Sequence, residues 1–357
     1  MPTPANAITT DALIIGAGPA GLFAAFELGL LGISAHIVDA LPYAGGQCIE
    51  LYPDKPIYDI PGTPATTGRQ LVAQLLEQIK PFNTPLHLGQ QVSVLEIPNA
   101  SANEQTNLAR FKVSSTANQT FVAKAIVIAA GVGAFVPKKL SVAGMDAFDG
   151  TQMVYHANQL PKAANQRITV VGSEDTAVQA AIDLCQHQAQ HHSVTLLHRR
   201  DVFNAAPETL HTMRSLVASG QLRLCIGQIA GFDTDKNRLS ALHITDVDGV
   251  TNALPTDTLL VLQGLSPKLG PVADWGLALE RKQLPVDTAK FQTSEAGIFA
   301  VGDINTYPGK KKLIVSGFHE ATLAAYAVAD RLNPHTPTPL LYTTTGSLLL
   351  ELLGKLV

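Results

Sequence analysis

The chain has 357 residues, 46% of them hydrophobic and 15% charged, and this length predicts about two domains. The formal net charge of -4 argues against a nucleic-acid binder, because phosphate recognition needs a concentrated basic face. The polar segment Met1 to Thr10 lacks the basic region followed by an apolar region that marks a secretory signal. No apolar run in the sequence reaches the length of a membrane span. We therefore expect a cytoplasmic globular protein with no nucleic-acid and no membrane partner.

The first predicted element is a strand-helix-strand unit. An apolar run from Ala12 to Ile15 precedes a Gly-rich turn, helical spacing follows from Leu22 to Leu31, and a second apolar run ends in Asp39. In such a turn the glycines allow tight turning, backbone approach to a pyrophosphate and close packing, while the acid holds ribose hydroxyls. The residues expected to bind a dinucleotide are Gly16, Gly18, Pro19, Ala20, Gly21 and Asp39.

Three segments follow in which apolar and polar residues alternate, and this pattern predicts an antiparallel meander of half-buried strands. They run from Gln91 to Ile97, from Arg110 to Ser115 and from Gln119 to Ala123. An apolar segment from Ala125 to Ala130, ended by Gly131, predicts a further strand in a parallel sheet.

A second unit of the same kind begins with the apolar run Ile168 to Val171 and the turn at Gly172. In this turn Glu174 occupies the place of the second glycine, where a carboxylate would repel a pyrophosphate unless it is turned away or paired. Arg199 and Arg200 follow the unit's second strand, where arginines suit a 2'-phosphate and favour NADP(H) over NAD(H). A solvated basic turn is the alternative interpretation.

Two nucleotide-binding units, one with an acid and one with arginines, indicate electron transfer between NADPH and a flavin.

A strand from Gly297 to Asp303 and a helix from about Ser316 to Arg331 are predicted near the end of the chain, before a Pro-rich joint at residues 334–339.

The longest motifs lie outside the Gly-rich turns. They are Gly45-Gly46-Gln47, Leu51-Tyr52-Pro53, Ile57 to Gly62, Gly302-Asp303, Thr306 to Lys310 and Lys312-Leu313-Ile314. In these residues the chain resembles the ferredoxin-NADP reductases of the thioredoxin-reductase-like type, a homodimeric FAD family, from about Asp11 to Arg331. The resemblance implies a homodimer that carries non-covalent FAD and passes electrons between NADP(H) and ferredoxin or flavodoxin.

The resemblance also implies roles for individual residues. Tyr52 would stack on the isoalloxazine ring, although a core tyrosine is the alternative. The helix start at Leu313 and Ile314 would face the flavin pyrimidine, and Tyr342, followed by Thr343, would cover the other flavin face in the partner subunit. The remaining expected FAD contacts are Gly45, Gly46, Gln47, Val92, Gly131 and Asp303.

The expected fold class is α/β, with two Rossmann-like dinucleotide-binding domains. The FAD domain covers residues 1–136 and 287–333, the NADP(H) domain is inserted as residues 137–286, and residues 334–357 form a C-terminal extension. Its leucine-rich part, from Ser347, is too short to span a bilayer, and we expect it to dock on the other subunit.

Other functions make different demands on the sequence. Thioredoxin reductase activity needs a Cys-x-x-Cys pair, which Cys48, Cys185 and Cys225 do not form, and Cys48 alone is best explained as a small buried residue. A flavin-binding sensor with weakened NADPH turnover is motivated by Glu174, and another NADPH-dependent flavin reductase is also compatible. No metal site is expected, because the histidines at 187, 191 and 192 lack an acid or thiol partner. The lysines at 138, 139 and 310–312 offer either a ferredoxin-docking surface or ordinary solvated turns.

Overall fold

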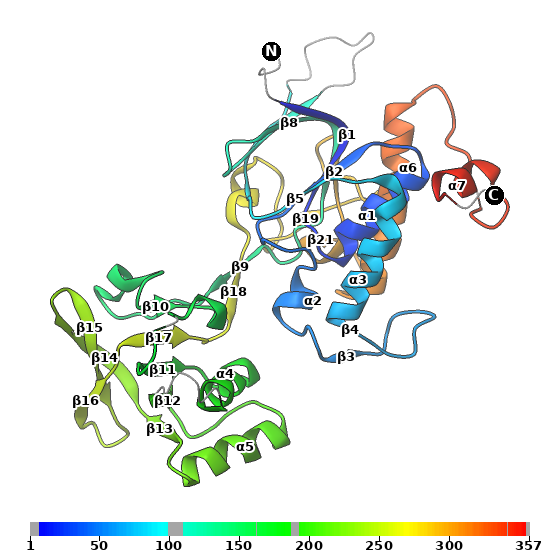
Figure 1. The fold of residues 1–357 in the computed structure, drawn as a ribbon. Helices are drawn as coiled ribbons and strands as arrows, with labels where there is room; N and C mark the ends of the chain where they lie inside the picture. The colour runs from blue at the N-terminus through cyan, green and yellow to red at the C-terminus, as the bar shows by residue number, and fades with distance from the viewer. Residues whose placement is uncertain (1–6, 99–109, 162, 187–192, 341, 355–357) are drawn as a thin grey trace. The chain divides into compact units, whose positions relative to one another are not determined.

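The computed structural model describes residues 7–98, 110–161, 163–186, 193–340 and 342–354. The chain forms two compact units (Figure 1). Unit 1 contains residues 1–134 and 267–357, and unit 2 contains residues 135–266. The chain passes between them in β9 (Ala134–Pro137) and β18 (Leu265–Lys268), which pair with each other.

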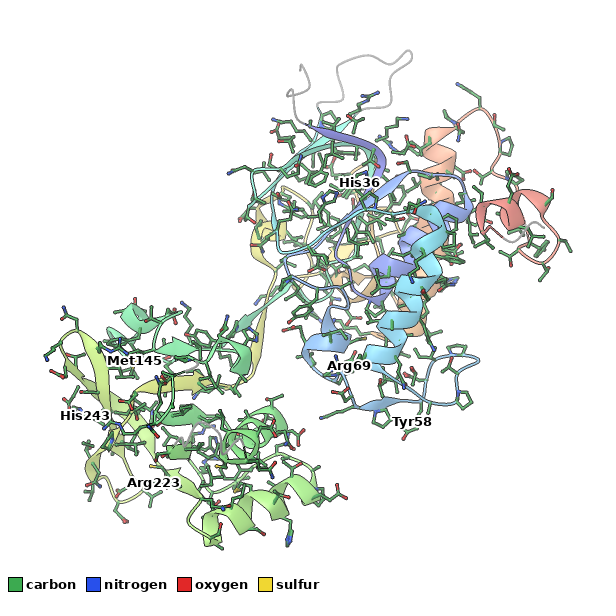
Figure 2. The ribbon with its side chains drawn as sticks, viewed as in Figure 1. His36, Tyr58, Arg69, Met145, Arg223 and His243 are labelled. Atoms are coloured by element: carbon green, nitrogen blue, oxygen red, sulfur yellow. The ribbon has the colours of Figure 1, made fainter. Side chains whose placement is uncertain are left out.

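Unit 1 is built on a seven-stranded mixed sheet. In spatial order its strands are β5 (Leu86–His87), β2 (Ala35–Val38), β1 (Ile8–Ile15), β8 (Thr120–Ile128), β7 (Phe111–Ser115) and β6 (Val92–Glu96), with β20 (Ile298–Ala300) also paired to β8. Strands β5, β2, β1, β8 and β20 are parallel, whereas β7 is antiparallel to both β6 and β8. At the edge, His36 of β2 (Figure 2) lies with Nδ1 2.9 Å from Nε2 of His87 of β5.

The helices and short strands of unit 1 complete the fold around this sheet. The helices are α1 (Pro19–Leu30), α2 (Gln47–Glu50), α3 (Gly68–Ile79), α6 (Ile314–Leu332) and α7 (Ser347–Leu352). The short strands are β3 (Pro56–Ile57), β4 (Thr66–Thr67), β19 (Leu284–Pro285) and β21 (Asn305–Thr306), which pair as β3 with β4 and β19 with β21.

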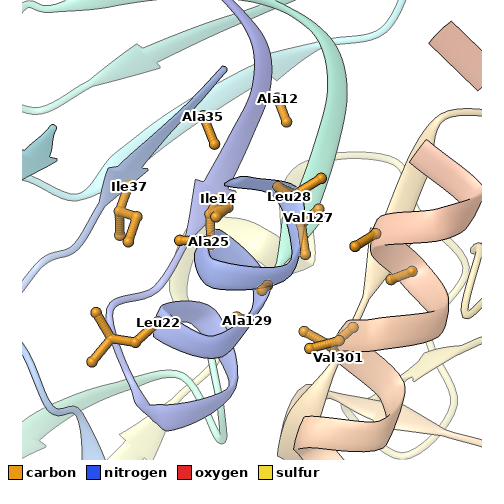
Figure 3. Packing of buried hydrophobic residues seen from close by; sticks show 14 of the residues in the cluster. Ala12, Ile14, Leu22, Ala25, Leu28, Ala35, Ile37, Val127, Ala129 and Val301 are labelled. Atoms are coloured by element: carbon orange, nitrogen blue, oxygen red, sulfur yellow. The ribbon is translucent and has the colours of Figure 1, made fainter. Parts of the chain in front are cut away.

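Both faces of the sheet in unit 1 are buried. Ala12 and Ile14 of β1 point to the core that α1, α3 and α6 cover, whereas Leu13 and Ile15 point to a second core on the other face. Figure 3 shows part of the first core, with Ala12 and Ile14 labelled near α1. Successive residues of a strand face opposite sides, so a strand covered on both sides reads as the continuous apolar run seen in the sequence.

Three features of unit 1 differ from the sequence expectations. β1 begins at Ile8 rather than Ala12, because Thr9 and Thr10 pair with the first half of β8 although they are polar. The segments expected as separate strands before and after Lys124 form one strand, β8. The chain returns to unit 1 at Pro267 rather than at 287, because Val272, Trp275, Leu277 and Leu284 are buried in the second core of this unit.

Unit 2 has its own parallel five-stranded sheet. In spatial order the strands are β10 (Met153–Val154), β17 (Thr258–Val261), β11 (Arg167–Val171), β12 (Ser193–His198) and β13 (Leu222–Ile226). The helices are α4 (Asp175–Gln186) and α5 (Pro207–Ala218), which pack on one face. A three-stranded antiparallel sheet of β14 (Gln228–Asp235), β15 (Arg238–Thr245) and β16 (Thr251–Pro255) contributes to the core on the other face. The fold therefore matches the expected class of two Rossmann-like units.

Candidate functional site

The Gly-rich turn of unit 1 has the geometry of a phosphate-binding turn. Gly16 has a φ of +116°, and a Cβ there would lie 2.4 Å from the carbonyl oxygen of Ala129. A Cβ at Gly21 would lie 1.9 Å from the carbonyl oxygen of Gly16, so the close approach of α1 to β1 requires glycine. At Gly18, by contrast, a Cβ would meet nothing within 4 Å. The open space over this glycine is what a bound pyrophosphate needs.

The N-terminus of α1 faces this open space. Gly18 is the N-cap and forms no side-chain cap, and Pro19 occupies the first helical turn. The first N–H groups of the helix therefore have no side-chain acceptor at the cap and present a positive dipole end to an anion.

Asp39 connects the end of β2 to the Gly-rich turn. Its carboxylate accepts hydrogen bonds from the N–H groups of Ala17 at 2.5 Å and Leu41 at 2.8 Å. Burial raises the pKa of Asp39, while the two backbone donors oppose that shift. The acid expected to hold ribose hydroxyls is thus fixed beside the turn, as the sequence pattern predicts.

The Gly45-Gly46-Gln47 motif packs on the same turn. Gly45 donates its N–H to the carbonyl of Ala17 at 2.9 Å, and a Cβ at Gly46 would lie 3.2 Å from Cα of Gly18. Gln47 donates from Nε2 to Oδ2 of Asp303 at 3.0 Å. The structure therefore brings motifs from both ends of unit 1 to one place.

Gly131 and Ala20 lie beside the residues that the Gly-rich turn, Gln47 and Gly302-Asp303 bring together. A Cβ at Gly131 would lie 3.1 Å from Nε2 of Gln47, and a Cβ at Gly302 would lie 3.1 Å from Cβ of Ala20. Val92 differs, because its side chain is buried in the second core at the start of β6. Its role in flavin binding stays a prediction.

Tyr52 follows α2 and is half-buried against the first core. Its hydroxyl lies 3.6 Å from Sγ of Cys48, and burial raises the pKa of both groups. A buried thiol with a raised pKa is a poor nucleophile and a poor thiolate donor. Cys48 thus fits the expectation of a small buried residue, and stacking of Tyr52 on flavin stays a prediction.

A buried ionic network supports the Gly302-Asp303 motif. Glu320 of α6 is fully buried and accepts hydrogen bonds from the N–H of Gly302 at 2.7 Å, from Nδ2 of Asn305 at 2.8 Å and from the hydroxyl of Tyr307 at 2.9 Å. Lys310, whose side chain is 6% exposed, pairs with the same carboxylate and donates to the carbonyl of Gly302 at 2.9 Å. Lys310 is therefore no part of a solvated docking surface, whereas Lys311 and Lys312 are exposed.

The start of α6 also has free backbone donors. Its N-cap, Leu313, makes no side-chain cap, and Ile314 begins the helix. The dipole of this 19-residue helix is positive at that end, which suits a neighbouring group that gains negative charge.

The C-terminal segment places Tyr342 at the surface. Tyr342 is 65% exposed, Thr343 is exposed, and α7 contacts α1 of the same chain through a segment in which Leu349 is buried. The expected covering of a partner's flavin by Tyr342 and Thr343 stays a prediction.

In unit 2, Gly172 has the packing role of a first glycine, because a Cβ there would lie 2.3 Å from the carbonyl oxygen of Leu262. Glu174 is exposed, and its Oε2 accepts a hydrogen bond from Nδ2 of Asn204 at 2.8 Å. Two residues thirty positions apart in the sequence are thus direct partners. The sequence pattern singles out Glu174 but carries no signal for its contact with Asn204.

Arg199 and Arg200 follow β12 and are exposed. In the part of the chain that the structure describes, no carboxylate lies within ion-pair distance of either guanidinium, whereas the neighbouring Asp201 pairs with Arg214 at 2.5 Å. Two unpaired guanidinium groups at the end of this strand are suited to a phosphate.

Other expectations concern metals and membranes. Among the described residues no group of three or more His, Cys, Asp and Glu side chains could hold a metal ion, and His187, His191 and His192 lie outside those residues. Within the described chain, none of the helices combines the length and apolar character needed to cross a membrane.

Comparison with known proteins decides the family. The model of the pyridine nucleotide-disulphide oxidoreductase family matches residues 10–328. The chain belongs to this family. Among its curated relatives, the ferredoxin–NADP reductase of Albidiferax ferrireducens is 51% identical over 97% of this chain and 96% of the relative. The ferredoxin–NADP reductase of a Polaromonas species is 50% identical over 97% of this chain and 93% of the relative. The resemblance seen in the sequence motifs is thereby confirmed.

Among solved structures, this pyridine nucleotide-disulphide oxidoreductase is similar to the thioredoxin reductase of T. acidophilum. The TM-score is 0.61 with 21% identity, and the similarity covers 91% of this chain and 99% of that chain. At this identity the comparison supports the fold alone, and that fold agrees with two Rossmann-like units.

Proposed function

We propose that this protein is a ferredoxin–NADP reductase, with FAD bound by unit 1 and NADP(H) by unit 2. The single observation that carries the proposal is the nearly full-length match, at about half identity, to relatives of that name. The site residues support it independently, because unit 1 has an open Gly18 beside a fixed Asp39, and in unit 2 Arg199 and Arg200 have no carboxylate partner among the described residues.

In the proposed mechanism, a bound flavin supplies the conversion between hydride pairs and single electrons. Gly18 and the first N–H groups of α1 bind the pyrophosphate, and Asp39 accepts hydrogen bonds from ribose hydroxyls. Tyr52 would hold the flavin ring by stacking, and the N-terminus of α6 would favour a negatively charged flavin. Arg199 and Arg200 bind the 2'-phosphate of NADP(H).

The proposal extends to assembly and location. The protein is proposed to be a cytoplasmic homodimer in which Tyr342 and Thr343 cover the flavin of the partner subunit. Three isolated cysteines suit a reducing compartment. The lack of a Cys-x-x-Cys pair directs electrons to a one-electron carrier, ferredoxin or flavodoxin, rather than to a disulfide.

The test is electron delivery from the FAD-loaded protein. The flavin is first reduced anaerobically with NADPH, and oxidised ferredoxin or flavodoxin is then added. Either carrier is expected to restore the absorbance of the oxidised flavin, whereas oxidised thioredoxin is expected to leave the flavin reduced. Reoxidation by thioredoxin and not by either carrier would contradict the proposal. Negligible reduction of the flavin by NADPH would instead favour a flavin-binding sensor, for which Glu174 in the second turn is the motivating feature.

A further inference from the structure

The turn of unit 2 carries two successive carboxylates where α4 begins. Glu174 stands where a dinucleotide turn has its second glycine, and Asp175 is the first residue of α4. An anion that approaches this helix N-terminus gains from the backbone N–H groups but is repelled by any carboxylate free to turn toward it.

Both carboxylates are engaged by one segment, residues 204–206. Asn204 donates from Nδ2 to Oε2 of Glu174 at 2.8 Å, and its backbone N–H donates to the carbonyl of Ser173 at 2.8 Å. The N–H of Ala206 donates to Oδ1 of Asp175 at 3.1 Å. Three hydrogen bonds therefore tie the turn to the segment that follows the arginines.

The partner of Glu174 is a neutral amide. An arginine or lysine at position 204 would cancel the negative charge of Glu174, but an asparagine can only fix the direction in which the carboxylate points. The bond is exposed to solvent, so its own contribution to folding stability is small. Its effect is on where the charge lies.

We propose that Asn204 is a positioning residue that holds the Glu174 carboxylate aside from the pyrophosphate position, and so keeps this modified turn able to bind NADP(H). The inference rests on the proposed function, because it assumes that unit 2 binds the nucleotide. It makes the two residues interdependent: Glu174 is tolerated in the turn because Asn204 is present.

The size of the effect follows from the charges. A carboxylate that is free to approach a pyrophosphate in a solvated turn is expected to lower the affinity for the nucleotide on the order of five- to tenfold. The reason is that the repulsion between two charges about 4–5 Å apart in water is close to the free energy that corresponds to such a change in the dissociation constant. Salt screens exposed charges, so the penalty is expected to shrink as ionic strength rises.

The experiment measures the dissociation constant of NADP+ for the oxidised, FAD-loaded full chain by titration calorimetry. Asn204→Ala is expected to weaken binding about five- to tenfold at low salt, and less at high salt. Asn252→Ala, an exposed asparagine of β16 in the same unit, is the matched control and should bind as the unmodified protein does.

Two double variants separate positioning from direct contact. If Asn204 acts only through the Glu174 charge, Asn204→Ala should have no effect in a Glu174→Gly background, and Glu174→Gln should rescue Asn204→Ala. A loss of affinity that persists in both backgrounds would overturn the inference, as would unchanged affinity in Asn204→Ala. Absence of NADP+ binding by the unmodified protein would overturn the proposed function itself, and with it this inference.

Discussion

Replacing Lys310 with methionine removes the cation from a carboxylate that has no access to water. Glu320 is 0% exposed and the Lys310 side chain 6% exposed, and three neutral or backbone donors would remain around the carboxylate after the substitution. Breaking a buried ion pair by removing one partner costs about 3–5 kcal/mol, because the other charge stays buried without compensation. That is a large part of the roughly 5–15 kcal/mol that stabilises a typical domain.

The assay is thermal unfolding of the full chain followed by circular dichroism, with FAD at one fixed saturating concentration. For a domain of about 150–250 residues each kcal/mol lowers the melting temperature by about 2–4 °C, so Lys310→Met is expected to lower it by at least about 6 °C. The neighbouring exposed residue provides the matched control, Lys311→Met, for which little change is expected.

A double variant tests the cause. Lys310→Met with Glu320→Gln removes both charges, so part of the lost stability should return. The reasoning is refuted if Lys310→Met melts like Lys311→Met, or if the double variant is less stable than Lys310→Met alone.

The remaining predictions concern unit 2 and the edge of the sheet in unit 1. Replacing Arg199 and Arg200 with alanine should weaken binding of NADP+ much more than binding of NAD+ in calorimetric titrations, and equal losses would count against contact with the 2'-phosphate. The pKa of His36 is lowered by burial and by His87, and burial lowers the pKa of His87. The pKa values in the folded state lie below the unfolded value of about 6.5, so the contribution of the two neutral histidines to the free energy of unfolding is present above that pH and is lost as the pH falls below it. Denaturant unfolding at pH 7.5 and 5.5 should show a smaller acid loss in His36→Gln, and an unchanged loss would exclude this pair as its source.

Local patterns in the sequence predicted most of what lies near the Gly-rich turns. Ala12 to Ile15 and Ala35 to Val38 are strands, and the helix between them starts at Pro19. A buried parallel strand leaves a continuous apolar run in the sequence, and the Gly-rich turn marks the place where the helix begins. The placement of Asp39 beside the turn follows from the same spacing.

Contacts between distant segments were beyond such patterns. The first half of β1 was missed because its threonines gain their strand pairing from β8, more than a hundred residues later. The sequence around Lys310 predicts a surface lysine, because nothing local to it shows that Glu320, ten residues on, is a fully buried partner. The pairing of Glu174 with Asn204 likewise depends on the tertiary fold.

Whether the protein passes hydride from NADPH to its flavin is measured by anaerobic mixing of the FAD-loaded protein with NADPH, and separately with NADH, while flavin absorbance is followed. We expect rapid loss of the oxidised flavin absorbance with NADPH and much slower loss with NADH at the same concentration, because Arg199 and Arg200 are proposed to bind the 2'-phosphate. Persistence of the oxidised spectrum with both nucleotides would contradict this expectation.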